Sequence, residues 1–144
     1  MKELYTEIEI EAPAERVWNI LTDFARFSEW NPFIRSIDGK PAIGSRLRVR
    51  IEPPGGRAMT FRPKLLRVEP QHELRWRGHL VLPGLFDGQH TFKIEPLGPN
   101  RVRFIQREKF SGLLTPLFAN SLEHRTKSGF KRMNEALKAR SESS

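Results

Sequence analysis

The pattern of apolar positions changes within the first thirty residues. The segment LYTEIEIE sets Ile8 and Ile10 against glutamates, which predicts a strand that is buried on one face. The next segment has its apolar residues at helical spacing, which predicts two short helices. The second of these should end at about Trp30, because Asn31 precedes a proline and a residue in that position avoids the helical region.

The middle of the chain alternates between apolar and polar positions. The segment RLRVRIE, for example, places Leu47, Val49 and Ile51 on one face. In MTFRPKLLRVEP the apolar phase shifts between Leu65 and Val68, which indicates a bulge. Several alternating runs joined by short loops rich in glycine and proline predict an antiparallel meander of about six strands.

The last thirty residues return to helical spacing. Apolar residues recur every three or four positions from Phe118 to Leu137, after a Thr-Pro pair that suits a helix start. This pattern predicts one long amphipathic helix to about Ala139, followed by a frayed tail, RSESS. Gly129 lies in the middle of this helix, where glycine costs about 1 kcal/mol relative to alanine, so we expect it to allow a close approach to the sheet.

The predicted order is one strand, two short helices, about six strands and one long helix. A single antiparallel sheet with helices on one side is an α+β fold. A curved sheet and a long helix can also enclose a cavity. The chain has 144 residues and no internal repeat or linker, which predicts one domain over residues 1–144.

Composition and charge narrow the possible functions. There is no cysteine, which excludes disulfides and cysteine-based metal sites. The formal net charge is +8, but Lys and Arg alternate with apolar residues along the predicted strands, which favours a solvated surface over a nucleic-acid footprint. The start lacks a basic stretch followed by an apolar run, and no segment approaches the roughly 18 apolar residues of a membrane span, so we expect a soluble cytoplasmic protein. An exposed edge strand would permit a homodimer.

Several kinds of site have no support in the sequence. The four histidines show no metal-ligand spacing, and alternation sends His79 and His90 to opposite faces of the sheet, so we expect no metal site. The sequence has no G-x-S-x-G, no phosphate loop and no dinucleotide-binding motif. We therefore expect no cofactor.

Three segments carry a resemblance to a known family. They are IEAPAERVWNILTDFARFSEWNPFI, FRPKLLRVEPQHELRWRG and FDGQHTFKIEPLGPNRVRFIQREKFSGLL, and together they cover essentially the whole chain. The chain resembles the START-like superfamily, also called the helix-grip, Bet v 1-like or SRPBCC fold. Within it, the chain is most similar to the bacterial polyketide cyclase/dehydrase and lipid-transport group.

This resemblance implies a curved seven-stranded antiparallel sheet wrapped around the long C-terminal helix, with two short helices after the first strand. It also implies a hydrophobic cavity between sheet and helix. Members of the superfamily bind lipids, sterols, polyketides and other apolar molecules, and a few catalyse aromatic cyclisation. Some relatives act on other proteins, as chaperone activators or ribosome-associated factors. The fold therefore indicates a pocket more strongly than an activity.

Polar residues at inward positions point to the chemistry of that pocket. His90, Gln106 and Glu108 lie on neighbouring predicted strands and share one face. A buried carboxylate needs a partner, and a histidine that titrates near neutral pH could supply one. We interpret them as a polar anchor for a ligand carbonyl or hydroxyl, or as a general acid/base pair of His90 and Glu108. The alternative is that Glu108 reaches solvent near the strand end and only orders a loop.

The predicted ligand-binding residues are the inward aromatic, apolar and polar positions together with two residues of the Asn-Pro turn. The alternative for the apolar members is an ordinary packed core. The ligand would pass the turn at Trp30–Phe33, which we expect to act as a lid, and the loop around Pro83–Asp87. The full set is Trp30, Phe33, Phe61, Trp76, His90, Phe92, Phe104, Gln106, Glu108, Phe118, Leu122, Thr126 and Met133.

Three functions remain open at this point. The first is a protein that binds a small hydrophobic or amphipathic organic ligand. The second is a cyclase or dehydratase that uses His90 and Glu108 in the same cavity. The third is an interaction protein that uses its basic exterior.

Overall fold

The computed structural model describes residues 2–79, 87–113 and 115–143, and the side chains of all of these except residues 115–123. No helix in this described part of the chain is long and apolar enough to cross a membrane. The elements, in chain order, are β1 (Lys2–Ile10), α1 (Ala14–Thr22), the 3-10 helix η1 (Phe24–Arg26), α2 (Phe27–Trp30), β2 (Ile34–Asp38), β3 (Arg48–Ile51), β4 (Met59–Phe61), β5 (Lys64–Glu69), β6 (Glu73–His79), β7 (Asp87–Gly98), β8 (Arg101–Ser111) and α3 (Thr115–Glu142).

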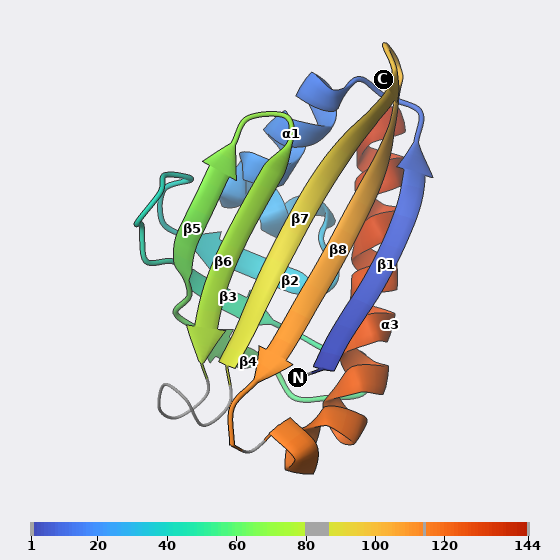
Figure 1. The fold of residues 1–144 in the computed structure, drawn as a ribbon. Coiled ribbons are helices and arrows are strands. Elements are labelled where there is room, and N and C mark those ends of the chain that lie inside the picture. Colours follow the sequence, from blue (N-terminus) through green and yellow to red (C-terminus); the bar gives the residue numbers. More distant parts are fainter. Residues whose placement is uncertain (1, 80–86, 114, 144) are drawn as a thin grey trace.

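The strands form two antiparallel sheets. The large sheet has the order β1-β8-β7-β6-β5, and the small sheet has the order β2-β3-β4. Figure 1 shows α3, the short helices and the small sheet all on the same face of the large sheet. The inward positions of the strands and the apolar stripe of α3 meet in this space and form the core. The α+β class and the helix-grip arrangement are therefore as the sequence predicts.

The predicted single sheet of seven strands is wrong in one respect, because the described residues form eight strands in two sheets. The reason is Pro63, which separates β4 from β5 and has no N–H group to donate to a strand ladder. Its carbonyl instead accepts a hydrogen bond from the Leu47 N–H at 2.8 Å, where the chain passes from the small sheet to the large one. The predicted bulge is confirmed by a register shift between Leu65 and Arg67.

The Asn-Pro turn after α2 is built by a buried asparagine. Asn31 is fully buried, and its Oδ1 accepts hydrogen bonds from the N–H groups of Phe33 (2.9 Å) and Ile34 (2.8 Å). This turn directs the Phe33 ring toward α3 at Gly129, where a Cβ atom would lie 2.3 Å from the ring carbons. The mid-helix glycine therefore allows a close approach, as expected, but the element that approaches is the Phe33 ring.

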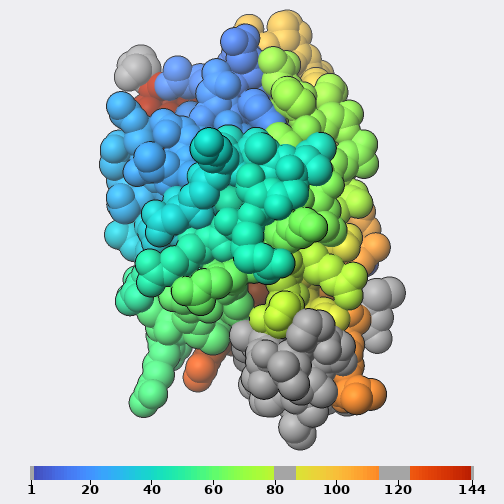
Figure 2. All heavy atoms as spheres, turned by 90° about the vertical axis from the view of Figure 1, so that its left-hand side faces the viewer, coloured from blue at the N-terminus to red at the C-terminus, as the bar shows by residue number. Residues whose placement is uncertain are grey.

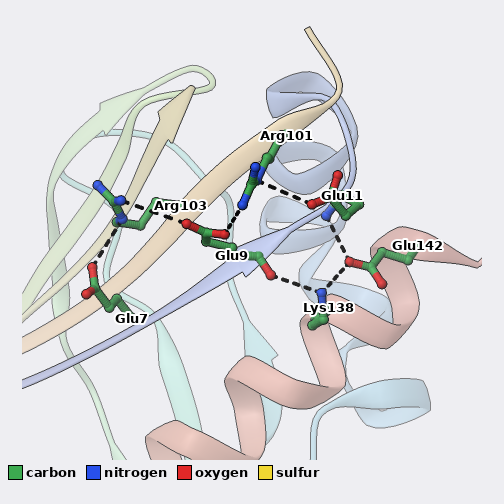
Figure 3. A network of polar contacts seen from close by, with 7 residues as sticks. All are labelled: Glu7, Glu9, Glu11, Arg101, Arg103, Lys138 and Glu142. Carbon is green, nitrogen blue, oxygen red and sulfur yellow. Dashed lines mark hydrogen bonds and ion pairs between the residues drawn. The ribbon is translucent and has the colours of Figure 1, made fainter. Parts of the chain in front are cut away.

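The C-terminal end of α3 is docked against β1, and the prediction of a frayed tail after about Ala139 is wrong. The helix continues to Glu142. Figure 3 shows the contacts that hold it: Lys138 Nζ donates to the Glu9 carbonyl (3.1 Å) and to Glu142 (2.6 Å). The Glu142 carboxylate also accepts a hydrogen bond from the Glu11 N–H at 2.8 Å. These contacts satisfy backbone groups that a frayed end would leave to water.

The arginines on the outer face of β8 are paired with carboxylates. Arg101 forms ion pairs with Glu9 and with Glu11, the latter at 3.3 Å, and Arg103 pairs with Glu7 at 3.3 Å (Figure 3). All five side chains are substantially exposed, so each pair contributes little to stability. The pairing does neutralise the cations of this face, which fits a solvated surface better than a phosphate-binding one.

Candidate functional site

A cavity lies between the two sheets and α3. Its volume is about 90 Å³ and most of its lining is apolar. Figure 2 shows a hollow in the surface between the β3–β4 hairpin, in green, and the end of β6, in yellow-green, with atoms of α3 visible at its bottom. The lining residues are Phe33, Val49, Ile51, Pro53, Met59, Phe61, Pro63, Trp76, Gly78, His79, Gly88, His90, Glu108, Phe110, Thr126 and Phe130.

Three residues of the large sheet stand in one row on the cavity wall. Trp76 on β6 pairs with His90 on β7, and His90 pairs with Glu108 on β8. Residues that are directly opposed in antiparallel strands project from the same face with their Cβ atoms about 5 Å apart, so these side chains meet. Gly88, at the neighbouring inward position of β7, leaves room for the carboxyl group, since a Cβ atom there would lie 2.7 Å from Glu108 Oε1.

His90 is surrounded by aromatic rings and is only 4% exposed. Its ring stacks on Phe92 with 4.1 Å between centroids, and the Phe130 and Trp76 rings lie 4.8 and 5.6 Å away. Burial among these rings lowers the pKa of His90 to about 3, although the hydrogen bond to Gln106 acts in the opposite direction. The expectation that His90 titrates near neutral pH is therefore wrong, and the imidazole is neutral there.

Glu108 faces the cavity with a side chain that is 15% exposed. Its Oε2 is 3.4 Å from His90 Nδ1 and, among the described residues, this buried oxygen has no hydrogen-bond partner. Burial raises the pKa of Glu108 to about 8. The carboxyl group is therefore mostly protonated at neutral pH, so His90 and Glu108 meet as a neutral base and a neutral acid.

Gln106 connects His90 to α3 and β1. Its Oε1 lies 3.0 Å from His90 Nε2, and its Nε2 donates to the Phe130 carbonyl (3.2 Å) and to Asn134 Oδ1 (2.8 Å). Asn134 Nδ2 in turn donates to Thr6 Oγ1 at 3.1 Å. Gln106 is fully buried and does not line the cavity, so it lies behind His90 and supports it.

The structure brings some of the predicted ligand-binding residues to the cavity and leaves others away from it. Those that line it are Phe33, Phe61, Trp76, His90, Glu108 and Thr126. Those that do not are Trp30, Phe92, Phe104, Gln106 and Met133. The side chains of Phe118 and Leu122 lie outside the described residues, as does the loop around Pro83–Asp87 apart from Asp87 itself, which is buried at the start of β7.

The residues that miss the cavity do so because it occupies only one end of the space between sheet and helix. Phe92, Phe104 and Met133 are almost fully buried and fill the other end with a packed core. Trp30 packs on Phe27, with 5.0 Å between ring centroids, and does not form part of the cavity wall. Of the two aromatic residues expected to form the lid, only Phe33 lines the cavity.

Some lining residues were not predicted as site residues. Val49, Ile51 and Phe110 stand at inward positions of β3 and β8, and Phe130 is one helical turn from Thr126, so alternation and helical spacing could have identified them. For His79, the alternation along β6 gave the wrong prediction. Alternation places this exposed residue on the outer face, yet it lines the cavity at the end of β6.

Comparison with known proteins identifies the family of this chain. A family model described as "Polyketide cyclase / dehydrase and lipid transport" matches residues 1–142. No curated protein matches the chain.

Solved structures share the fold at low sequence identity. A START superfamily protein from Mycobacterium smegmatis is 21% identical with a TM-score of 0.77, and the match covers 97% of each chain. The Zhui aromatase/cyclase from Streptomyces sp. R1128 is 18% identical with a TM-score of 0.76, over 98% of this chain and 93% of that one. Norcoclaurine synthase from Thalictrum flavum, solved in complex with dopamine and hydroxybenzaldehyde, is 16% identical with a TM-score of 0.71, over 96% and 84%. At these identities the likeness concerns the fold.

Proposed function

Because this chain belongs to the polyketide cyclase/dehydrase and lipid-transport family, we propose that it binds a small hydrophobic or amphipathic organic molecule in the cavity between its sheets and α3. The observation that carries the proposal is the composition of the cavity wall. Apolar side chains make up most of it, and His90, Glu108 and Thr126 are among its few polar groups. Such a wall is typical of sites for small organic ligands.

The size of the cavity limits what it can hold. Its volume of about 90 Å³ lies below the roughly 300–1,000 Å³ of most ligand pockets, and below the roughly 150 Å³ of an engineered cavity that binds benzene. The cavity therefore takes at most about one ring, and even a single-ring ligand, or the ring-sized end of a larger molecule, would have to shift its wall slightly. A bulkier ligand would have to displace part of the wall, such as the Phe33 ring or the β3–β4 hairpin.

The charge state of the wall also constrains the ligand. At neutral pH, His90 is uncharged and Glu108 is mostly protonated, so neither polar group offers a compensating charge to an anion or a cation. An ionic ligand group placed there would lose its hydration without gaining a counter-ion. The proposed ligand therefore presents a neutral polar group, a carbonyl or a hydroxyl, to His90 and Glu108.

Mass spectrometry of the purified protein tests the proposal directly. We expect native spectra to show an added mass that disappears under denaturing conditions. Thr126→Phe, which fills the cavity from α3, should abolish the added mass. The matched control Lys127→Phe changes the next residue, which is exposed, and should keep it. A protein that is reproducibly empty, and that binds no single-ring aromatic molecule in titrations, would contradict the proposal.

A second candidate, a cyclase or dehydratase acting in the same cavity, is favoured by one feature. A carboxyl group that stays protonated at neutral pH can act as a general acid, and Glu108 is held in that state 3.4 Å from a second proton-transfer group, His90 Nδ1. The low pKa of His90 makes it a weak base, which is why we rank binding first. With a carbonyl-bearing substrate, His90→Ala should abolish turnover with little loss of affinity if the protein is an enzyme, and should weaken affinity if it only binds.

The third candidate, an interaction protein with a basic binding surface, has less support. The arginines on the outer face of β8 are already paired with glutamates of β1 (Figure 3). A salt-dependent association with RNA or ribosomes would nevertheless favour it, because counterion release makes such binding fall with salt. Absence of binding at low salt would end it.

A further inference from the structure

The orientation of the Gln106 side-chain amide is fixed by the backbone. The Phe130 carbonyl lies 3.2 Å from one terminal atom of this amide, and a carbonyl oxygen can only accept a hydrogen bond. That terminal atom must therefore be the amide nitrogen, since the opposite orientation would bring two oxygen acceptors together in a fully buried site. Asn134 is consistent with this orientation, because its Oδ1 accepts the second N–H of Gln106 at 2.8 Å.

This orientation determines which ring nitrogen of His90 carries the proton. The Oε1 atom of Gln106 faces His90 Nε2 at 3.0 Å, and an amide oxygen requires a donor. A neutral imidazole has one N–H group, so Nε2 holds the proton and Nδ1 keeps a free lone pair. Nδ1 is the nitrogen that approaches Glu108, a residue of the cavity wall, to 3.4 Å.

We propose that Gln106 is a positioning residue that holds His90 in its Nε2–H tautomer, so that the cavity presents Nδ1 as an acceptor and selects ligands that carry a hydroxyl group. This inference rests on the proposed binding function and names the ligand class more narrowly. The hydrogen bonds point in one direction: His90 Nε2–H donates to Gln106 Oε1, and Gln106 Nε2 donates to the Phe130 carbonyl.

A hydroxyl group fits this site better than a carbonyl group. It can donate its hydrogen to His90 Nδ1 and, with an oxygen lone pair, accept the hydrogen of a protonated Glu108. A carbonyl group can only accept, so it would leave the Nδ1 lone pair without a donor once it takes the Glu108 hydrogen. Sites built to pair with a hydroxyl group discriminate strongly against analogues that lack it, because their own polar groups are then left unpaired.

The tautomer can be measured on the free protein by 15N NMR of the histidine side chains, with the His90 signals assigned from their loss in His90→Asn. In the wild type we expect the pattern of an Nε2–H tautomer. Gln106→Leu should convert it to an Nδ1–H tautomer or a mixture. Thr6→Val is the matched control at the far end of the hydrogen-bond chain, and it should leave the tautomer unchanged because the Phe130 carbonyl still orients Gln106. A wild-type Nδ1–H tautomer, or no change in Gln106→Leu, would overturn the inference.

Selectivity is tested with three neutral single-ring probes, phenol, toluene and benzaldehyde, in NMR titrations at pH 6.5. The wild type should bind phenol about tenfold more tightly than toluene, which has nearly the same shape, and more tightly than benzaldehyde. In Gln106→Leu the preference for phenol over benzaldehyde should shrink or reverse, whereas Thr6→Val should keep it. Equal binding of phenol and toluene would refute the hydroxyl preference and leave the proposed binding function standing. Binding of none of the three would refute both.

Discussion

Replacing Glu108 by glutamine should change how the stability of the fold depends on pH. The carboxyl group of Glu108 is buried against His90 and apolar rings, and burial raises its pKa from 4.5 to about 8. In the unfolded chain the same group ionises near pH 4.5. Between these values the folded state binds a proton that the unfolded state has released, so the free energy of unfolding falls as pH rises. Glutamine has nearly the same shape and cannot ionise, so this dependence should disappear in Glu108→Gln.

The expected magnitude is clearest between pH 6.5 and 8. There His90 is neutral in the folded state, and its titration in the unfolded state is the same in the wild type and in Glu108→Gln, so it cancels in the comparison. One proton difference changes the free energy of unfolding by about 1.4 kcal/mol per pH unit. The proton difference falls to about one half by pH 8, where the folded group itself begins to ionise, so the Glu108 contribution over this interval is about 1.6 kcal/mol. That is a large part of the roughly 5–15 kcal/mol that stabilise a domain of this kind.

Urea unfolding followed by circular dichroism at pH 5, 6.5, 8 and 9 measures this difference. The wild type should lose about 1.6 kcal/mol relative to Glu108→Gln between pH 6.5 and 8. Glu135→Gln serves as the control because Glu135 is an exposed glutamate on α3, and its profile should follow that of the wild type. Parallel profiles for the wild type and Glu108→Gln over this interval would show that Glu108 is ionised in the folded protein and would refute the reasoning.

Three further substitutions test the surroundings of the cavity. Between pH 6.5 and pH 4, the free energy of unfolding measured with urea should fall less in His90→Gln than in the wild type. Burial lowers the pKa of His90 to about 3, so below pH 6.5 the unfolded wild type binds a proton that the folded state does not. Gly129→Ala should lower Tm, since the added Cβ would lie 2.3 Å from the Phe33 ring and overpacking costs about 1–3 kcal/mol; a higher Tm would contradict the contact. Asn31→Ala should cost about 2–3 kcal/mol in urea unfolding, because it leaves the N–H groups of Phe33 and Ile34 without their buried acceptor, and a loss below about 0.5 kcal/mol would contradict this.

The inward faces of the strands could be predicted from the sequence because each is set by alternation along one strand. The positions of His90 and Glu108 on the inner face follow from period two, as does the burial of Val49 and Phe104. The end of α2 at Trp30 is equally local, since it depends on the Asn-Pro pair. Wherever a single element and its own spacing decide the outcome, the sequence is sufficient.

Features that depend on how elements align could not be predicted in the same way. The row of Trp76, His90 and Glu108 requires the registers of two strand pairs, and no local pattern specifies them. Gln106 shares the inner face with Glu108, but only the depth of α3 in the fold decides that it bonds to the Phe130 carbonyl and does not reach the cavity. The extent of the cavity is likewise a property of packing between the sheets and the helix.

The charge state of the His90–Glu108 pair differs between the sequence-based expectation and the structure, and this difference changes which ligands the site can hold. In a sequence the two residues suggest an ion pair, but taking both ions out of water costs several kcal/mol per ion. At 3.4 Å, among aromatic rings, the proton is better placed on the carboxyl group, which leaves a neutral acid beside a neutral imidazole. The pair still provides one donor and one acceptor, so nothing is lost for hydrogen bonding. What it loses is charge, and that loss is why the site suits an uncharged ligand and would resist a carboxylate or an ammonium group of the same size.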